Sequence, residues 1–329
     1  MAVKRLLLPL LLLLLVVAAI VSMGTGAVFI SPREIAEALL GTGTKNHAFI
    51  IGQYRLPRVA LGMLAGAGLA VSGVILQGMI RNPLASPDVI GITKGAGLAA
   101  AIVIFLCPKS PPVLLPLAAF CGAAAVAFVL YLYTRRRSVQ PSTLALVGIA
   151  LGVVCQAGIQ YLMVKNPGDV NAALLWMAGS LWGRGWEHMW AVLPWLSVFL
   201  PLTLLASRRL DVLSLGDDIA EGLGERVDRL RVLLLIASVA LAGACVAAVG
   251  SIGFVGMLSP HIARKLVGGQ HAILTPVAAC IGALLIVIAD SIGRGLLPPM
   301  EVPVGIVTAI IGAPYFLYLL ARERKKRFS

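Results

Sequence analysis

The sequence predicts an all-α, polytopic membrane protein with about ten transmembrane helices and an internal inverted repeat. Of its 329 residues, 59% are hydrophobic and 12% are charged, and the mean hydropathy is +0.96. A soluble domain needs more charge than this to cover its surface, whereas a helix that crosses a bilayer needs about 20 apolar residues. We therefore expect one membrane domain that occupies residues 1–329.

Nine apolar runs are long enough to be read as membrane spans. The first run follows Lys4 and Arg5, as the core of a signal peptide would, but it exceeds about 20 residues and lacks a clear cleavage site. We expect it to be retained as a span. A tenth, shorter run contains glycine, proline and charge and is expected to be a partial span. The nine runs are 6–30, 57–80, 88–106, 113–134, 141–164, 188–206, 231–250, 271–293 and 303–321, and the partial run is 252–268.

The net charge of +13 reflects the orientation of the chain in the membrane. With ten segments and both termini inside the cell, 19 of the 27 lysines and arginines fall on the inner side. This bias follows the positive-inside rule, and nine segments would place the basic C-terminal tail outside. We therefore expect a multi-pass protein of the cell membrane whose surroundings are the lipid bilayer, and no nucleic-acid partner.

Two similar stretches predict the inverted repeat. Residues 55–59 and 229–232 each open a span rich in glycine and alanine, and these spans lead to Gly/Pro-rich bends at 77–87 and 253–261. Five segments separate the two openings, so the halves are expected to lie in opposite orientations, as they do in many transporters. On the first of these spans, a series of small residues predicts close packing between helix backbones. The series is Gly62, Gly66, Gly68 and Gly73.

One long polar segment, residues 207–231, interrupts the apolar sequence and must lie outside the membrane. A helix is expected to begin after Gly216, because the acidic pair 217–218 suits the positive end of a helix dipole. Glycines 222 and 224 can end that helix, and a second amphipathic turn follows at 225–231. The segment is therefore predicted to offer a short helical element to a soluble partner.

No enzyme motif is present. The sequence contains no Walker A motif, no HExxH zinc motif and no GxSxG nucleophile elbow, so we do not expect it to hydrolyse nucleotides or to be an enzyme. The five cysteines lack the spacing of metal ligands and are expected to be buried thiols. The acidic residues at 217–221 lack a second cluster to share a metal with. We expect neither a cofactor nor a metal.

Four charged residues near the ends of predicted spans are candidates for a functional role. Asp290 lies inside an apolar run, where an acid costs about 3 kcal/mol unless it is paired, and Arg294 stands one turn away as the expected partner. A proton relay through Asp290 is the alternative, although other buried acids are missing. Arg55, Arg58 and Arg294 are all expected at outer helix ends. They could extend to the membrane interface, or they could receive acidic side chains of a soluble protein.

Several motifs resemble the FecCD family of ABC importer permeases. They are residues 55–58, 66–73 and 77–91, then 171–184, 253–261 and 303–314. The similarity covers nearly the whole chain and is greatest to permeases for ferric citrate and ferric siderophores. The resemblance implies import of an iron chelate through ten helices per subunit. It also implies a second permease subunit, identical or paralogous, two cytoplasmic ABC ATPases and an extracytoplasmic substrate-binding protein. A haem or vitamin B12 permease and an ion-coupled secondary transporter are the alternatives.

The resemblance also implies roles for individual residues. A coupling element for the ATPase comprises Gly216, Asp217, Asp218, Ala220, Glu221, Leu223, Gly224, Arg226 and Asp228, with tight packing expected at Ala220 and Gly224. Acidic residues of the binding protein are expected to dock on Arg55, Arg58 and Arg294. A cytoplasmic constriction of the pathway is expected at Asn82, Pro83, Leu84, Ser142 and Thr143.

Overall fold

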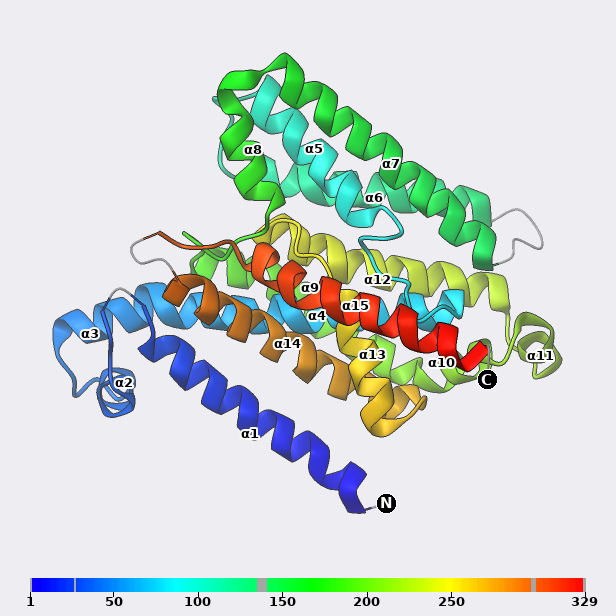
Figure 1. Ribbon diagram of the computed structural model, residues 1–329, viewed down its shortest axis with the longest axis horizontal. Coiled ribbons are helices and arrows are strands. Elements are labelled where there is room, and N and C mark those ends of the chain that lie inside the picture. The colour runs from blue at the N-terminus through cyan, green and yellow to red at the C-terminus, as the bar shows by residue number, and fades with distance from the viewer. Residues whose placement is uncertain (1, 27, 135–140, 297–299, 328–329) are drawn as a thin grey trace.

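The computed structural model describes residues 2–26, 28–134, 141–296 and 300–327, and its regular elements within these ranges are helices (Figure 1). Seven helices in these ranges are long and apolar enough to cross a membrane. Ten helices correspond to the ten predicted runs. They are α1 (Ala2–Gly24), α4 (Leu56–Ile80), α5 (Ile92–Leu106), α6 (Leu114–Thr134), α7 (Pro141–Lys165), α9 (Trp186–Leu205), α12 (Val227–Val249), α13 (Val255–Val267), α14 (His271–Leu296) and α15 (Val304–Arg327).

The boundaries of two runs differ from the prediction. The first run was expected to reach residue 30, but α1 ends at Gly24 and a new helix, α2 (Pro32–Leu39), follows. A capping box fixes the start of α2, because the Ser31 hydroxyl accepts from the backbone of Glu34 while the Glu34 carboxylate accepts from the backbone of Ser31. The run expected at 88–106 begins late, at Ile92, because the bend before it continues to Gly91. The basic triplet Arg135–Arg137 lies outside the described residues.

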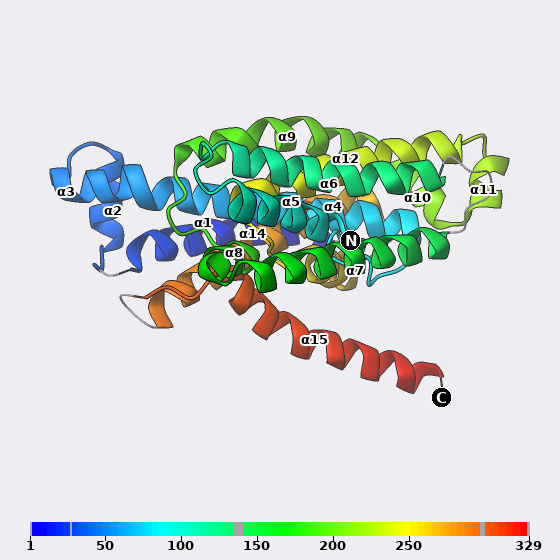
Figure 2. The same cartoon turned by 90° about the horizontal axis from the view of Figure 1, so that it is seen from above.

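Short helices occupy both ends of the molecule. At one end, α2 and α3 (Lys45–Phe49) lie beside a π-helical turn, Ile50–Arg55, that continues into α4. At the opposite end, α10 (Ser207–Ser214) and α11 (Asp217–Gly222) form the polar segment (Figures 1 and 2). A further short helix, α8 (Val170–Met177), lies between α7 and α9. By the predicted orientation, α2 and α3 are at the outer end and α11 is at the inner end.

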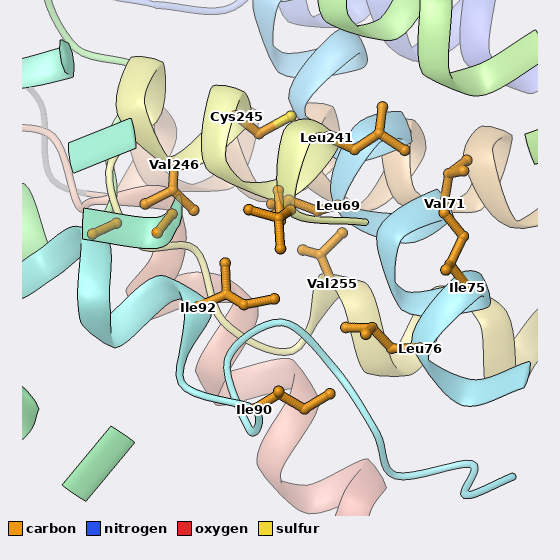
Figure 3. Packing of buried hydrophobic residues seen from close by; sticks show 14 of the residues in the cluster. Leu69, Val71, Ile75, Leu76, Ile90, Ile92, Leu241, Cys245, Val246 and Val255 are labelled. Atoms are coloured by element: carbon orange, nitrogen blue, oxygen red, sulfur yellow. The ribbon is translucent and has the colours of Figure 1, made fainter. Parts of the chain in front are cut away.

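The centre of the protein is the crossing of α4 and α12, the two most buried of the long helices. They run in opposite directions, and apolar side chains from both fill the core together with residues of α5 and α13 (Figure 3). A pair of serines joins them, since the Ser72 hydroxyl lies 2.9 Å from the Ser238 carbonyl and 2.7 Å from the Ser238 hydroxyl. Inside a membrane such groups need partners from the protein itself, so this pair fixes how the two helices meet.

The packing around this pair confirms the predicted inverted repeat. Helix α4 packs against α13 and α14, and its counterpart α12 packs against α5 and α6. Likewise α5 packs on α6 as α13 packs on α14. Each central helix is followed by a bend and a short helix, α5 or α13, so the two broken elements lie on either side of the crossing.

The predicted close packing of glycines is also confirmed. A Cβ atom placed on Gly73 of α4 would overlap the carbonyl group of Gly256 in α13. A Cβ on Gly66 would likewise overlap the carbonyl group of Gly282 in α14. These two glycines therefore let α4 touch both of its neighbours backbone to backbone.

Candidate functional site

At the outer end, two of the predicted docking arginines hold α1 in place. Arg55 is 8% exposed and Arg294 is 7% exposed. The last carbonyl groups of a helix have no partner inside it, and these guanidinium groups supply the missing donors for α1 and the residues just after it. Arg55 donates to the carbonyl groups of Met23 and Val28, and Arg294 donates to those of Ser22 at 2.9 Å and Thr25 at 3.0 Å.

The third arginine, Arg58, lies between two carboxylates. The expected pair of Asp290 and Arg294 is present, with 3.1 Å between Oδ2 and Nε. Asp290 also accepts from Arg58, from Nη2 at 2.8 Å and from Nε at 3.1 Å. Glu301, just before α15, accepts from Nη2 of Arg58 at 2.7 Å and from Nη1 at 3.1 Å. Sequence reasoning missed both Arg58 contacts.

The three arginines face one cavity of about 450 Å³ at the outer end. Its wall adds a fourth arginine, Arg184, which the sequence analysis did not select, and the acids Glu187 and Glu301. Burial lowers the pKa of the Arg184 guanidinium, whose Nη1 lies 2.9 Å from His188 Nε2. The cavity therefore carries more positive than negative side chains, which is the field an anionic or acidic partner requires.

At the inner end, the polar segment folds as predicted after Gly216. Helix α11 begins at Asp217, and Gly224 with φ +85° turns the chain towards α12. The second amphipathic turn is the first turn of α12 rather than a separate helix. An additional helix, α10, precedes the element.

The surface of this element is partly apolar. Ile219 is 52% exposed and Leu223 is 63% exposed, whereas Ala220 is fully buried and packs into the chain itself. A Cβ on Gly224 would meet nothing within 4 Å, so this position faces open space. The sequence analysis did not identify Ile219, because it considered the charged residues of α11 and not which residues share one face of the helix. The other exposed members are Asp218, Glu221, Arg226 and Asp228.

Asp217 clamps α11 to both central helices. Arg231, on α12, places Nη2 at 2.7 Å and 2.8 Å from the two carboxylate oxygens of Asp217. Arg81, which ends α4 in the left-handed conformation with φ 56°, places Nη2 at 3.6 Å from Oδ1 of the same carboxylate. Arg81 directly precedes the bend at 82–84, so this clamp connects the polar segment to the predicted constriction.

The residues of the predicted constriction fall in two places. In the bend, the Asn82 side chain accepts from the backbone N–H of Leu84 at 2.9 Å, which shapes the turn around Pro83. The bend then enters the core at residues 85–87. Ser142 and Thr143 are exposed at the start of α7. Their role in a constriction stays a prediction.

We expect Asp217→Asn to destabilise the protein by about 1–2 kcal/mol. The substitution leaves the buried Arg231 guanidinium, whose side chain is 8% exposed, without its charged partner. Asp217 itself is 30% exposed, which keeps the loss below that of a fully buried pair. Thermal unfolding in lipid nanodiscs measures the effect. Asp218→Asn, the same change at the exposed neighbour, is the control and should unfold like the unmodified protein; equal unfolding temperatures for the two variants would contradict the clamp.

Comparison with known proteins gives consistent results. The model of the FecCD transport family matches residues 13–322. The chain is 57% identical over 311 residues to the Fe(3+)-citrate import system permease protein YfmE of Bacillus subtilis (strain 168), covering 94% of this chain and 93% of that protein. It is 46% identical to the Fe(3+) dicitrate transport system permease protein FecD of Escherichia coli (strain K12), covering 85% and 87%.

A solved structure has the same fold. It is described as an inward-facing conformation of a metal-chelate type ABC transporter, and it superimposes with a TM-score of 0.87 at 32% sequence identity. The match covers 96% of this chain and 98% of that chain. The ten helices and the broken elements around α4 and α12 are therefore features that this chain has in common with a transporter subunit.

Proposed function

Because the chain belongs to the FecCD transport family, we propose that it is the membrane-spanning permease subunit of an ABC importer that carries an iron chelate into the cytoplasm. The observation that carries this proposal is the 57% identity, over nearly the full length of both chains, to a permease named for Fe(3+)-citrate import. Ferric citrate is the substrate that we propose first, and a ferric siderophore is the second candidate. The positively charged outer cavity supports an anionic chelate.

The two ends of the molecule suit two different partners. We propose that the inner element, residues 216–228, docks on a cytoplasmic ABC ATPase through the exposed face that holds Ile219 and Leu223. At the outer end, the cluster around Arg58 receives an extracytoplasmic binding protein. A second permease subunit completes the pathway, and the bend at 82–84 with the start of α7 forms its inner constriction. The assembly lies in the bacterial cell membrane.

The environment of Asp290 argues against an ion-coupled secondary transporter. A proton-coupled carrier needs an acid that can exchange its proton with water. Asp290 is 2% exposed and lies within 3.1 Å of both Arg58 and Arg294. Both of its oxygens are engaged by guanidinium groups of the chain itself, so Asp290 serves as a structural link between α4 and α14.

Uptake into proteoliposomes tests this function. The tagged permease is purified with the ATPase that accompanies it and reconstituted, with ATP inside and the binding protein outside. We expect uptake of radiolabelled ferric citrate that requires both ATP and the binding protein. Uptake of cobalamin or haem in place of ferric citrate would contradict the proposed substrate but not the proposal that the protein is part of an ABC importer. Uptake driven by a proton gradient without ATP would contradict the importer itself.

A further inference from the structure

The guanidinium group of Arg58 already binds two carboxylates of the chain itself, each through two of its nitrogens. Asp290 takes Nε and Nη2, and Glu301 takes Nη1 and Nη2, all within 3.1 Å. Four of the five N–H groups are therefore in use, and both edges on which a guanidinium group binds a carboxylate with two hydrogen bonds are occupied. A carboxylate from a docking partner can therefore bind Arg58 with two hydrogen bonds only if one of the two internal carboxylates leaves.

The two carboxylates differ in what holds them. Asp290 is on α14, its side chain is 3% exposed, and Arg294 lies 3.1 Å from its second oxygen. Releasing it would leave charges buried without partners, which is costly. Glu301 precedes α15, and its side chain is 27% exposed. Rotation of this one side chain returns its carboxylate to water, so Glu301 is the group that can leave.

We propose that Glu301 is an internal placeholder for the carboxylate with which the extracytoplasmic binding protein engages Arg58. This inference rests on the proposed function, because it takes the importer's binding protein as the partner. In the free permease, Glu301 neutralises Arg58 and competes with the partner for the same donors. The contact raises the Kd for docking by the inverse of the fraction of time that Glu301 leaves Arg58 free, and it pairs Arg58 again when the binding protein departs.

The proposal predicts that removing the carboxylate of Glu301 increases the affinity of the permease for the binding protein. If the internal pair is formed for about 90% of the time, Glu301→Gln should lower the Kd by about tenfold. The test measures binding of the binding protein to the full permease–ATPase complex in nanodiscs by surface plasmon resonance. Glutamine keeps the size of the side chain, so the change acts mainly on charge.

Three further variants distinguish direct competition for Arg58 from a general effect of the net charge. Glu37→Gln removes an outer acid that pairs with Arg33 at 2.9 Å on α2, and it should leave the Kd unchanged. Arg58→Gln should weaken docking, and adding Glu301→Gln to it should bring no gain, because the competition is for Arg58. Thermal unfolding of each complex checks that the fold is intact.

The outcomes distinguish the placeholder role of Glu301 from the proposed docking of the binding protein itself. A Kd that falls with Glu301→Gln but not with Glu37→Gln supports the placeholder. If the unmodified complex binds the protein and Glu301→Gln binds no more tightly than Glu37→Gln, the placeholder is wrong while docking stands. If the unmodified complex fails to bind at all, the docking proposal is wrong, and the placeholder is overturned with it.

Discussion

Leu223→Asp is expected to abolish ATP-driven uptake while leaving the permease folded. Leu223 is 63% exposed at the end of α11, so its replacement costs little stability in the isolated chain. At an interface, losing an apolar anchor of this kind costs about 2 kcal/mol, which weakens affinity about 30-fold. An aspartate adds the cost of burying an unpaired charge against the partner.

Co-purification of the ATPase with the tagged permease measures this effect directly, and uptake into proteoliposomes measures its consequence. Leu40→Asp is the matched control, since Leu40 is 78% exposed at the end of α2, at the opposite end of the molecule. That variant should retain the ATPase. Retention of the ATPase by Leu223→Asp at the unmodified level would show that α11 does not dock it.

Gly73→Ala is expected to have the largest effect on stability, about 3 kcal/mol or more. The added Cβ overlaps the carbonyl group of Gly256, so α4 and α13 would have to separate at the most buried part of the molecule. Overpacking of a core costs about 1–3 kcal/mol even where side chains can adjust, and here the obstacle is backbone. A loss of this size is a large part of the total stability of a typical domain.

The yield of monodisperse protein and its unfolding temperature report this change. Gly97→Ala, on α5, is the control because its Cβ would lie 3.4 Å from the nearest atom, a methyl group of Ile159. That variant should be neutral or gain up to about 1 kcal/mol, as glycine-to-alanine changes in helices do. If both variants unfold at the same temperature, the contact between α4 and α13 does not limit stability.

Local patterns were sufficient to predict much of this molecule. Apolar runs located the ten helices, because a membrane span is defined by length and composition alone. The start of α11 followed from Gly216 and the acidic pair after it, and the Asp290–Arg294 pair followed from helical spacing. Each of these signals is contained within one or two helical turns, so a single sequence is enough to read them.

The remaining features depend on contacts between distant parts of the chain. Arg58 and Asp290 are separated by 232 positions, and nothing near either residue indicates the other. The hydrogen bonds from Arg55 to carbonyl groups at the end of α1 also could not be predicted. Every residue has a backbone carbonyl group, so the sequence does not indicate which of them an arginine binds. The late start of α5 depends on the bend at 82–91 entering the core, where Pro87 packs on Gly256 of α13 and Ile90 packs on Gly148 of α7.

Helix α4 links the two candidate sites. Arg58 is in its first turn and Arg81 ends it, so the outer cluster and the inner clamp are joined by 25 residues of continuous helix. A helix of this length is about 37 Å long and stiff along its axis. Movement of α11 that displaces Asp217 would therefore act on the helix that also carries Arg58, so α4 would connect the two proposed docking surfaces mechanically.

The arginine cap on α1 has a consequence for the biogenesis of the protein. Helix α1 is synthesised before α14, yet the donors that satisfy its last carbonyl groups include Arg294, which is synthesised 272 residues after Ser22. Only 17% of its apolar window is buried inside the protein, and the neighbour against which it packs most is again α14. Helix α1 cannot make these contacts before α14 has been inserted. We therefore expect the outer end of the protein to complete its assembly late.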